Sequence, residues 1–117
     1  MVNYKVLCIR QPWASMILKK EKTIELRSWY TDYRGPLLIA ASANPKIEGL
    51  PCGQLIALAN LVECRKSKRD DQWAARSELT WGRDTFSWIL KRVKPIKPIP
   101  IKGKLGLFEI KANVKFL

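Results

Sequence analysis

The stretch Lys22-Thr23-Ile24-Glu25-Leu26-Arg27 alternates apolar with polar or charged residues, a period of two that is typical of a β-strand. In such a strand the two apolar side chains face a core, and Thr23, Glu25 and Arg27 form a row on the opposite face. Lys22 enters at the leading end, so four hydrogen-bonding side chains lie within about 13 Å. The stretch predicts either a polar site or the ordinary solvated face of an antiparallel strand.

The size of the chain is that of one domain. It has 117 residues, of which 47% are apolar, so we expect residues 1–117 to form a single domain with its own core. Lysine and arginine number 22 against 10 acidic residues, a formal net charge of +12. This excess favours a polyanionic partner, and nucleic acid is the first candidate. A lysine-rich surface that only maintains solubility is the alternative.

The cysteines and the apolar runs indicate the compartment. Cys8, Cys52 and Cys64 are odd in number and have no C-x-x-C spacing, so we expect reduced thiols in a cytoplasmic protein and no metal site. No run approaches eighteen apolar residues, and no long amphipathic basic helix is evident, so we expect no membrane contact.

The chain contains no histidine, which excludes Ser-His-Asp and Cys-His sites and histidine-based RNA cleavage. Neither a P-loop nor a G-x-G-x-x-G motif is present, so we expect no nucleotide cofactor, and none of another kind is indicated. Proton transfer, if there is any, must use lysine, glutamate, aspartate, tyrosine or water. Lys22, Thr23 and Glu25 form the one compact cluster that offers such groups.

Strand patterns and turn residues alternate along the chain. We predict strands over residues 4–9, 22–27, 37–41, 54–63 and 105–110, a helix over 13–20 and a short helix through Trp73 and Leu79. Three prolines make residues 94–103 extended or an edge strand, whereas residues 86–93 fit both helix and strand periods. These elements predict an α+β, mostly β fold: a small, strongly curved, mainly antiparallel sheet or barrel.

Several residues outside the opening stretch are candidate ligand contacts. Arg10, Gln11 and Trp13 occupy a strand-to-helix junction, whose free N–H groups suit phosphate or carboxylate. Ser42 follows a buried strand and is expected at the rim of a cavity. Trp88 and the other tryptophans offer surfaces for base stacking, or are ordinary core residues.

The polar cluster permits two kinds of chemistry. Lys22 can act as a general base if burial or the neighbouring Arg27 lowers its pKa, while an ionised Glu25 raises it. Thr23, activated by that lysine, would be a nucleophile. The same groups would serve equally well to bind the hydrogen-bonding edge of a nucleobase.

Two basic segments are candidates for contact with a nucleic-acid backbone, and the alternative for each is a solvated surface. The first is a turn after the fourth predicted strand, and the second is the proline-rich segment and its flanks. Their residues are Arg65, Lys66, Lys68 and Arg69, and Lys91, Arg92, Lys94, Lys97, Lys102 and Lys104.

Four ordered motifs carry a resemblance to a known family. They are Ile9-Arg10-Gln11-Pro12-Trp13-Ala14, Lys22-Thr23-Ile24-Glu25-Leu26-Arg27, Tyr33-Arg34-Gly35-Pro36-Leu37-Leu38-Ile39 and Lys102-Gly103-Lys104-Leu105-Gly106-Leu107-Phe108. Together they resemble the ASCH domain family, relatives of the PUA domains. The resemblance implies a PUA-like β-barrel with one or two short helices and a cleft for RNA or a nucleotide-like ligand. It also implies that residues 86–93 form a strand, with Trp88 against the barrel and Ser87 where glycine is usual.

The resemblance also implies hydrolytic activity as an alternative, because some members of the family are enzymes. One group removes the acyl group from 4-acetylcytidine, and another has been described as cleaving RNA. Lys22 would match the lysine proposed as catalytic in the first group, whereas Glu25 replaces its threonine. Glu63, Glu78 and Asp84 are the candidates for a catalytic acid.

Three hypotheses follow. The leading one is a cytoplasmic RNA- or nucleotide-binding module that uses the cleft and the basic segments. The second is a small hydrolase of a modified pyrimidine nucleoside or of RNA, with Lys22 as the base. The third is an adaptor that binds an unidentified protein partner through the aromatic turn 29–33.

Overall fold

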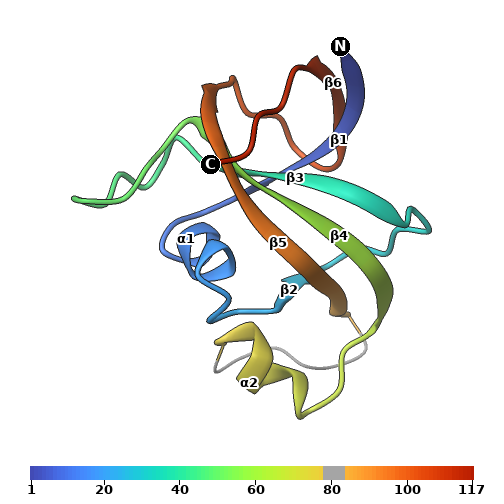
Figure 1. The fold of residues 1–117 in the computed structure, drawn as a ribbon. Coiled ribbons are helices and arrows are strands. Elements are labelled where there is room, and N and C mark those ends of the chain that lie inside the picture. Colours follow the sequence, from blue (N-terminus) through green and yellow to red (C-terminus); the bar gives the residue numbers. More distant parts are fainter. Residues whose placement is uncertain (78–83) are drawn as a thin grey trace.

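The computed structural model describes residues 1–77 and 84–117. This part of the chain forms one curved six-stranded sheet with two short helices beside it (Figure 1). In chain order the elements are β1 (Val2–Ile9), α1 (Trp13–Leu18), β2 (Ile24–Arg27), β3 (Gly35–Ala41), β4 (Gln54–Lys66), α2 (Asp71–Ala75), β5 (Phe86–Pro100) and β6 (Phe108–Ala112).

The strand order is β2-β5-β4-β3-β1-β6, and every neighbouring pair is antiparallel except β1 and β3. That parallel pair needs a long connection, which α1 and β2 supply. The prediction of a mainly antiparallel, mostly β fold is confirmed.

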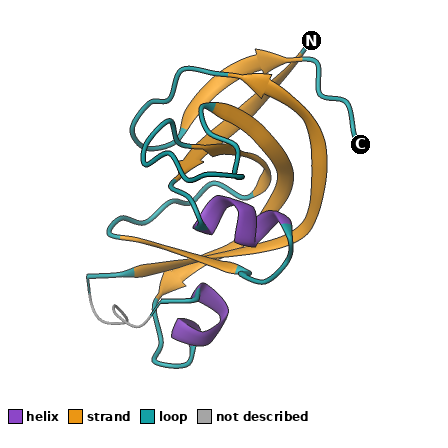
Figure 2. Ribbon diagram, turned by 90° about the vertical axis from the view of Figure 1, so that its left-hand side faces the viewer, coloured by secondary structure: helices purple, strands orange, loops and turns teal. Residues whose placement is uncertain are grey.

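The sheet is curved but does not close into a barrel, so the barrel expected from the sequence is replaced by an open form. β2 and β6 are its two edges. Beyond β6 the C-terminal segment turns back to β5, where Phe116 forms a single bridge with Ile96 and the Lys97 N–H donates to the Lys115 carbonyl. Figure 2 shows how strongly the long strands bend around α1.

The core consists of two buried clusters. The larger includes Leu7, Ile17, Leu61 and the fully buried Trp88, and the smaller is formed around Val6 and Ile96. These residues come from alternate positions of the strands and from one face of α1, as amphipathic elements require. Burial of the two clusters holds β1, β3 and β4 at the centre of the molecule.

β5 includes the proline-rich segment. β2 pairs only with residues 86–89 of β5, so the later part of the strand has an edge on which proline removes no ladder hydrogen bond. The predicted extended backbone is confirmed there, and so is the strand over residues 86–93.

Several predicted boundaries were wrong. β2 begins at Ile24, two residues late, and α1 ends at Leu18 because Lys20 adopts a left-handed backbone, with φ +66°. β6 begins at Phe108 and not at residue 105. α2 ends before Arg76, which is also left-handed, and Leu79 lies outside the described residues.

Candidate functional site

A cleft of about 900 Å³ opens beside β2. It is formed by the end of β1, the start of α1, the strand β2, the end of β3 and the loop before β6. Its lining residues are Cys8, Ile9, Arg10, Trp13, Lys22, Glu25, Leu26, Arg27, Ser28, Trp29, Ala41, Ser42, Ala43, Asn44, Gly53, Ser77, Ile101, Lys102, Gly103, Lys104, Leu105 and Gly106.

A row of three charged side chains, Lys22, Glu25 and Arg27, lines this cleft. Lys22 Nζ lies 3.3 Å from Glu25 Oε1, and Arg27 Nη2 lies 3.1 Å from Glu25 Oε2. The lysine side chain is 3% exposed and the glutamate side chain 11%. Each carboxylate oxygen therefore has its own cation, and the orientation of the carboxylate is fixed from both sides.

Lys22 is held by the backbone as well. Its Nζ donates to the carbonyl of Ala75, at the last residue of α2, where the helix dipole favours a cation. Burial lowers the pKa of Lys22 below its ordinary value of 10.5, the charge and hydrogen bond of Glu25 oppose this shift, and Arg27 adds a smaller decrease.

Arg27 fastens the row to β1, because its Nη2 also donates to the Cys8 carbonyl at 2.7 Å. Its Nε is buried and has no hydrogen-bond partner among the described residues. An arginine with one donor unused in this way can take up a further acceptor after a small movement of the side chain.

Four of the predicted ligand residues line the cleft together: Arg10, Trp13, Arg27 and Ser42. Trp13 is 40% exposed and Arg10 is exposed, so both belong to the rim. The catalytic candidates Lys22 and Glu25 also line the cleft. Six of the predicted ligand and catalytic residues, three of them from the stretch around β2, thus line one cleft.

Gln11, Thr23 and Trp88 lie elsewhere. Thr23 is exposed, is not part of β2 and does not line the cleft. Trp88 is fully buried, with its ring 4.7 Å from that of Trp29 in an edge-to-face pair. Trp88 is therefore a core residue and offers no surface for base stacking, which was the alternative expected for it.

Gln11 is buried and performs a structural task. Its Nε2 donates to Ser15 Oγ and to the Pro51 carbonyl, and its Oε1 accepts the Ser15 N–H. The amide ties the first turn of α1 to the loop after β3. The side chain thereby shapes the cleft without lining it.

The basic segments divide between the cleft and the outer surface. Lys102 and Lys104 line the cleft, whereas the exposed Lys91, Arg92, Lys94 and Lys97 lie on β5 away from it. Lys66, the last residue of β4, is exposed, as are Lys68 and Arg69 in the turn that follows. Arg65 is half-buried and committed to ion pairs, so it is a structural residue.

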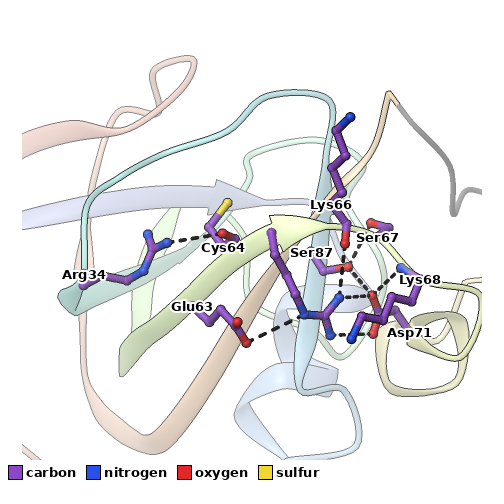
Figure 3. A network of polar contacts seen from close by, with 9 residues as sticks. Arg34, Glu63, Cys64, Lys66, Ser67, Lys68, Asp71 and Ser87 are labelled. Carbon is purple, nitrogen blue, oxygen red and sulfur yellow. Dashed lines mark hydrogen bonds and ion pairs between the residues drawn. The ribbon is translucent and has the colours of Figure 1, made fainter.

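Arg65 belongs to a polar network centred on Asp71, the first residue of α2 (Figure 3). Arg65 Nη1 and Nη2 donate to the two carboxylate oxygens of Asp71 at 2.7 and 2.9 Å. Asp71 Oδ2 also accepts from the Lys68 N–H and from the Ser87 hydroxyl, each at 2.8 Å. These bonds, led by that from Arg65, hold the pKa of Asp71 well below its usual range.

The network determines where α2 lies. The start of the helix is fixed to β4 and β5 through Asp71, and its end is fixed to the Lys22 segment. There the Ala74 carbonyl accepts the Thr23 N–H, and the Arg76 Nε donates to the Glu21 carbonyl. The bonds at both ends of α2 therefore place the Ala75 carbonyl next to Lys22. We call α2, held by these bonds, the brace.

Sequence reasoning missed this role of Asp71. Asp70 is the N-cap of α2 and makes no side-chain capping bond, whereas Asp71, the next residue, is the centre of the network. Ser87, where glycine was expected, was a usable signal because its hydroxyl is one of the donors to Asp71. Ser28 and Ser77 also line the cleft and were not predicted as site residues.

The candidates for a catalytic acid do not converge on the cleft. Glu63 is exposed and lies 3.7 Å from Arg65 Nε, and Asp84 is exposed. Neither lines the cleft. Glu78 lies outside the described residues.

No helix in the part of the chain that the structure describes is long and apolar enough to cross a membrane.

Comparison with curated proteins gives two relatives of the same name. Activating signal cointegrator 1 from Homo sapiens is 54% identical, and its counterpart from Mus musculus is 26% identical. Each match covers 92% of this chain and 22% of the relative. The chain thus spans about a fifth of the length of these proteins.

The fold is shared with solved structures. ASCH from Zymomonas mobilis superposes with a TM-score of 0.68 at 17% identity, covering 92% of this chain and 87% of the other. A mutant form of that protein gives the same TM-score at 16% identity, covering 92% and 90%. The family model of the ASCH domain matches residues 7–100. The chain belongs to the ASCH domain family, as its four motifs and its curved sheet both indicate.

Proposed function

We propose that residues 1–117 form one ASCH domain that binds RNA or a nucleotide-like ligand, with one nucleotide held in the cleft. The observation that carries the proposal is the row of Lys22, Glu25 and Arg27, the first two of them buried, in a cleft that the exposed cations Arg10, Lys102 and Lys104 also line. A recessed polar row suits a base edge, and a cationic rim suits phosphate.

Glu25 and Arg27 divide the recognition of the base. The fixed carboxylate accepts hydrogen bonds from an exocyclic amino group, as acidic side chains do when they recognise cytosine. Arg27 has a buried Nε without a partner among the described residues, and this donor suits a carbonyl or ring nitrogen of the ligand. The Glu25 carboxylate is held by Lys22 and Arg27 before the ligand arrives, which lowers the entropic cost of binding.

Around this polar row, aromatic and cationic side chains complete the site. Trp13 exposes 40% of its surface at the rim and offers a face on which a base can stack. Arg10, Lys102 and Lys104 are exposed around the same cleft and supply contacts to phosphate. The exposed cations of β5 and of the turn after β4 extend this contact along a longer RNA.

Binding of nucleoside monophosphates to the purified chain tests the proposal. We expect Glu25→Gln to weaken binding of the preferred nucleotide by about 1.5–3 kcal/mol, since a charged hydrogen bond is lost. Arg10→Gln, at an exposed position, should weaken phosphate contact without disturbing the fold. Glu63→Gln is the matched control, because Glu63 is an exposed glutamate outside the cleft. Equal affinities for the Glu25 and Glu63 variants would exclude base recognition by Glu25.

One observation favours a second function, hydrolysis of an acylated cytidine or of RNA. The lowered pKa of Lys22 brings its amine nearer to the range in which it can accept a proton, and the residue lines the cleft. In this function Glu25 takes the position next to the reacting group, because the exposed Thr23 does not line the cleft.

Incubation with 4-acetylcytidine and with mixed-sequence RNA separates the two functions. Turnover by the wild type and by Lys19→Ala, but not by Lys22→Ala, would establish the hydrolase. Binding without turnover would leave the binding module.

The compartment and the protein partner belong to the same proposal. Cys8, Cys52 and Cys64 are free thiols, in keeping with the cytoplasmic location inferred from the sequence. Within the aromatic turn 29–33, Trp29 and Tyr33 pack against the core and Tyr30 is 51% exposed. The surface available there to a protein partner is therefore small.

A further inference from the structure

Trp73, on α2, exposes 71% of its surface, far more than Trp13 at the rim of the cleft. Most of a large apolar side chain is thus left in water, which is uncommon for tryptophan. Together with Gln72, Arg76 and Ser77 it lines a shallow hollow of about 260 Å³. Ser77 also lines the main cleft, so the hollow and the cleft adjoin at this residue.

The surroundings of Trp73 are cationic. Arg76, the residue that ends α2, lines the hollow together with Trp73, and Arg69 lies two residues before the start of the helix. Both arginines are exposed, and the Arg76 Nε donates to the Glu21 carbonyl, which holds the guanidinium at the end of α2 next to the hollow. Asp70 is an exposed acid nearby, whereas the carboxylate of Asp71 is already occupied by Arg65.

The position of Trp73 is fixed by the brace. Asp71 anchors the first residue of α2, and the carbonyls of Ala74 and Ala75 anchor its end to Thr23 and Lys22. When a ligand stacks on an exposed aromatic ring, the ring loses less conformational entropy if it belongs to an anchored helix than if it belongs to a loose loop.

We propose that α2 forms a second nucleotide subsite: single-stranded RNA with one nucleotide in the cleft passes Ser77, and its neighbouring base stacks on Trp73. Arg76 lies beside this path and contacts the phosphate between the two nucleotides. The inference rests on the proposed function, because it requires that the cleft holds a nucleotide. It favours RNA over an apolar protein segment because the cationic Arg76 lines the same hollow as the ring, and the hollow adjoins a polar cleft.

Affinities for a nucleoside monophosphate and for a ten-nucleotide single-stranded RNA, measured side by side, test the inference. We expect Trp73→Ala to weaken RNA binding by about 5- to 150-fold, the range for loss of one stacked base. It should leave the monophosphate affinity within about twofold, because Trp73 does not line the cleft. Trp73→Phe, which keeps an aromatic face, should restore part of the loss.

Phe116→Ala is the matched control. Phe116 is an aromatic residue, 51% exposed, with the ammonium of Lys94 5.6 Å from its ring centre. It lies near the C-terminus, far from α2 (Figures 1 and 2). An equal loss of RNA affinity in the Trp73 and Phe116 variants would overturn the subsite, and so would unchanged RNA affinity in Trp73→Ala.

The two proposals fail in different ways. If the wild type binds the monophosphate and RNA but Trp73→Ala binds RNA equally well, the subsite is wrong and the cleft function stands. If the wild type binds neither ligand, the proposed function is wrong and the subsite fails with it. Thermal unfolding of each variant shows whether the fold is intact, which the exposure of residue 73 leads us to expect.

Discussion

Lys22 combines burial with charge, two properties that oppose each other. Its ammonium is almost wholly removed from water but faces Glu25 and the Ala75 carbonyl. Removal from water is the larger effect, so the pKa of Lys22 is lowered despite the nearby carboxylate. The same arrangement serves a base-binding pocket and a hydrolase, which is why substrates and not geometry must separate them.

Alkaline unfolding measures this balance. Because the pKa of Lys22 is lower in the folded state than its ordinary 10.5, the unfolded chain binds this proton more tightly. The free energy of unfolding therefore rises with pH between the native pKa and 10.5. We expect urea unfolding to show the wild type gaining stability relative to Lys22→Met across that interval. A difference in stability between the wild type and Lys22→Met that stays constant with pH would contradict the lowered pKa.

At the scale of elements, α2 connects two polar groups that the sequence does not place together. Asp71 at one end accepts from Arg65 of β4 and Ser87 of β5, and Ala75 at the other end accepts from Lys22. A five-residue helix is too short to be stable alone, so its position depends on these bonds. The position of Lys22 in the cleft therefore depends, through the brace, on the positions of β4 and β5.

Asp71→Asn tests the brace. We expect the free energy of unfolding at neutral pH to fall by about 3 kcal/mol, because the side chain of Arg65 loses its charged partner in a mostly buried pair. Since the pKa of Asp71 is lowered from 3.8, its contribution is present above pH 3.8 and is lost as pH falls below it. The difference between wild type and variant should therefore shrink in acid.

The reactivity of Lys22 gives a second measure of whether the brace holds the cleft in place. If α2 loosens, Lys22 Nζ should become more reactive toward acylating reagents, as measured by mass spectrometry. Glu63→Gln removes the other carboxylate near Arg65, at 3.7 Å and 56% exposed, and should cost no more than about 0.5 kcal/mol. Equal effects of the two substitutions would show that Asp71 does not anchor α2.

The elements also show what the sequence can predict. β3 and β4 were predicted because long apolar runs leave few alternatives to a buried strand. Residues 86–93 fit two periods, and pairing with β4 and β2 decides in favour of a strand, which is a tertiary effect. The proximity of residues within one short stretch, such as Lys22 and Glu25, was predicted. The partnership of Asp71 with Arg65 and Ser87 was not, because it joins three segments.

At the scale of the molecule, two sets of three cations that contribute to the net charge of +12 lie in different places. Arg10, Lys102 and Lys104 line the cleft, and Lys91, Lys94 and Lys97 are exposed along β5 outside it. All six attract a polyanion from a distance, but in our proposal only the first three contact the phosphates of a nucleotide bound in the cleft. Ligands of different length distinguish these contributions.

The salt dependence of binding measures them. Replacing either set of three by glutamine lowers the net charge equally, from +12 to +9, so the long-range attraction changes by similar amounts. With a ten-nucleotide RNA we expect each triple variant to reduce the slope of log K against log salt by about 2, at about 0.7 per phosphate contact on a single strand. With a trinucleotide only the cleft variant should reduce the slope, because a ligand of this length does not reach β5. Equal reductions for both variants with the trinucleotide would show that the charge acts as a diffuse field and that the cleft does not select the phosphates.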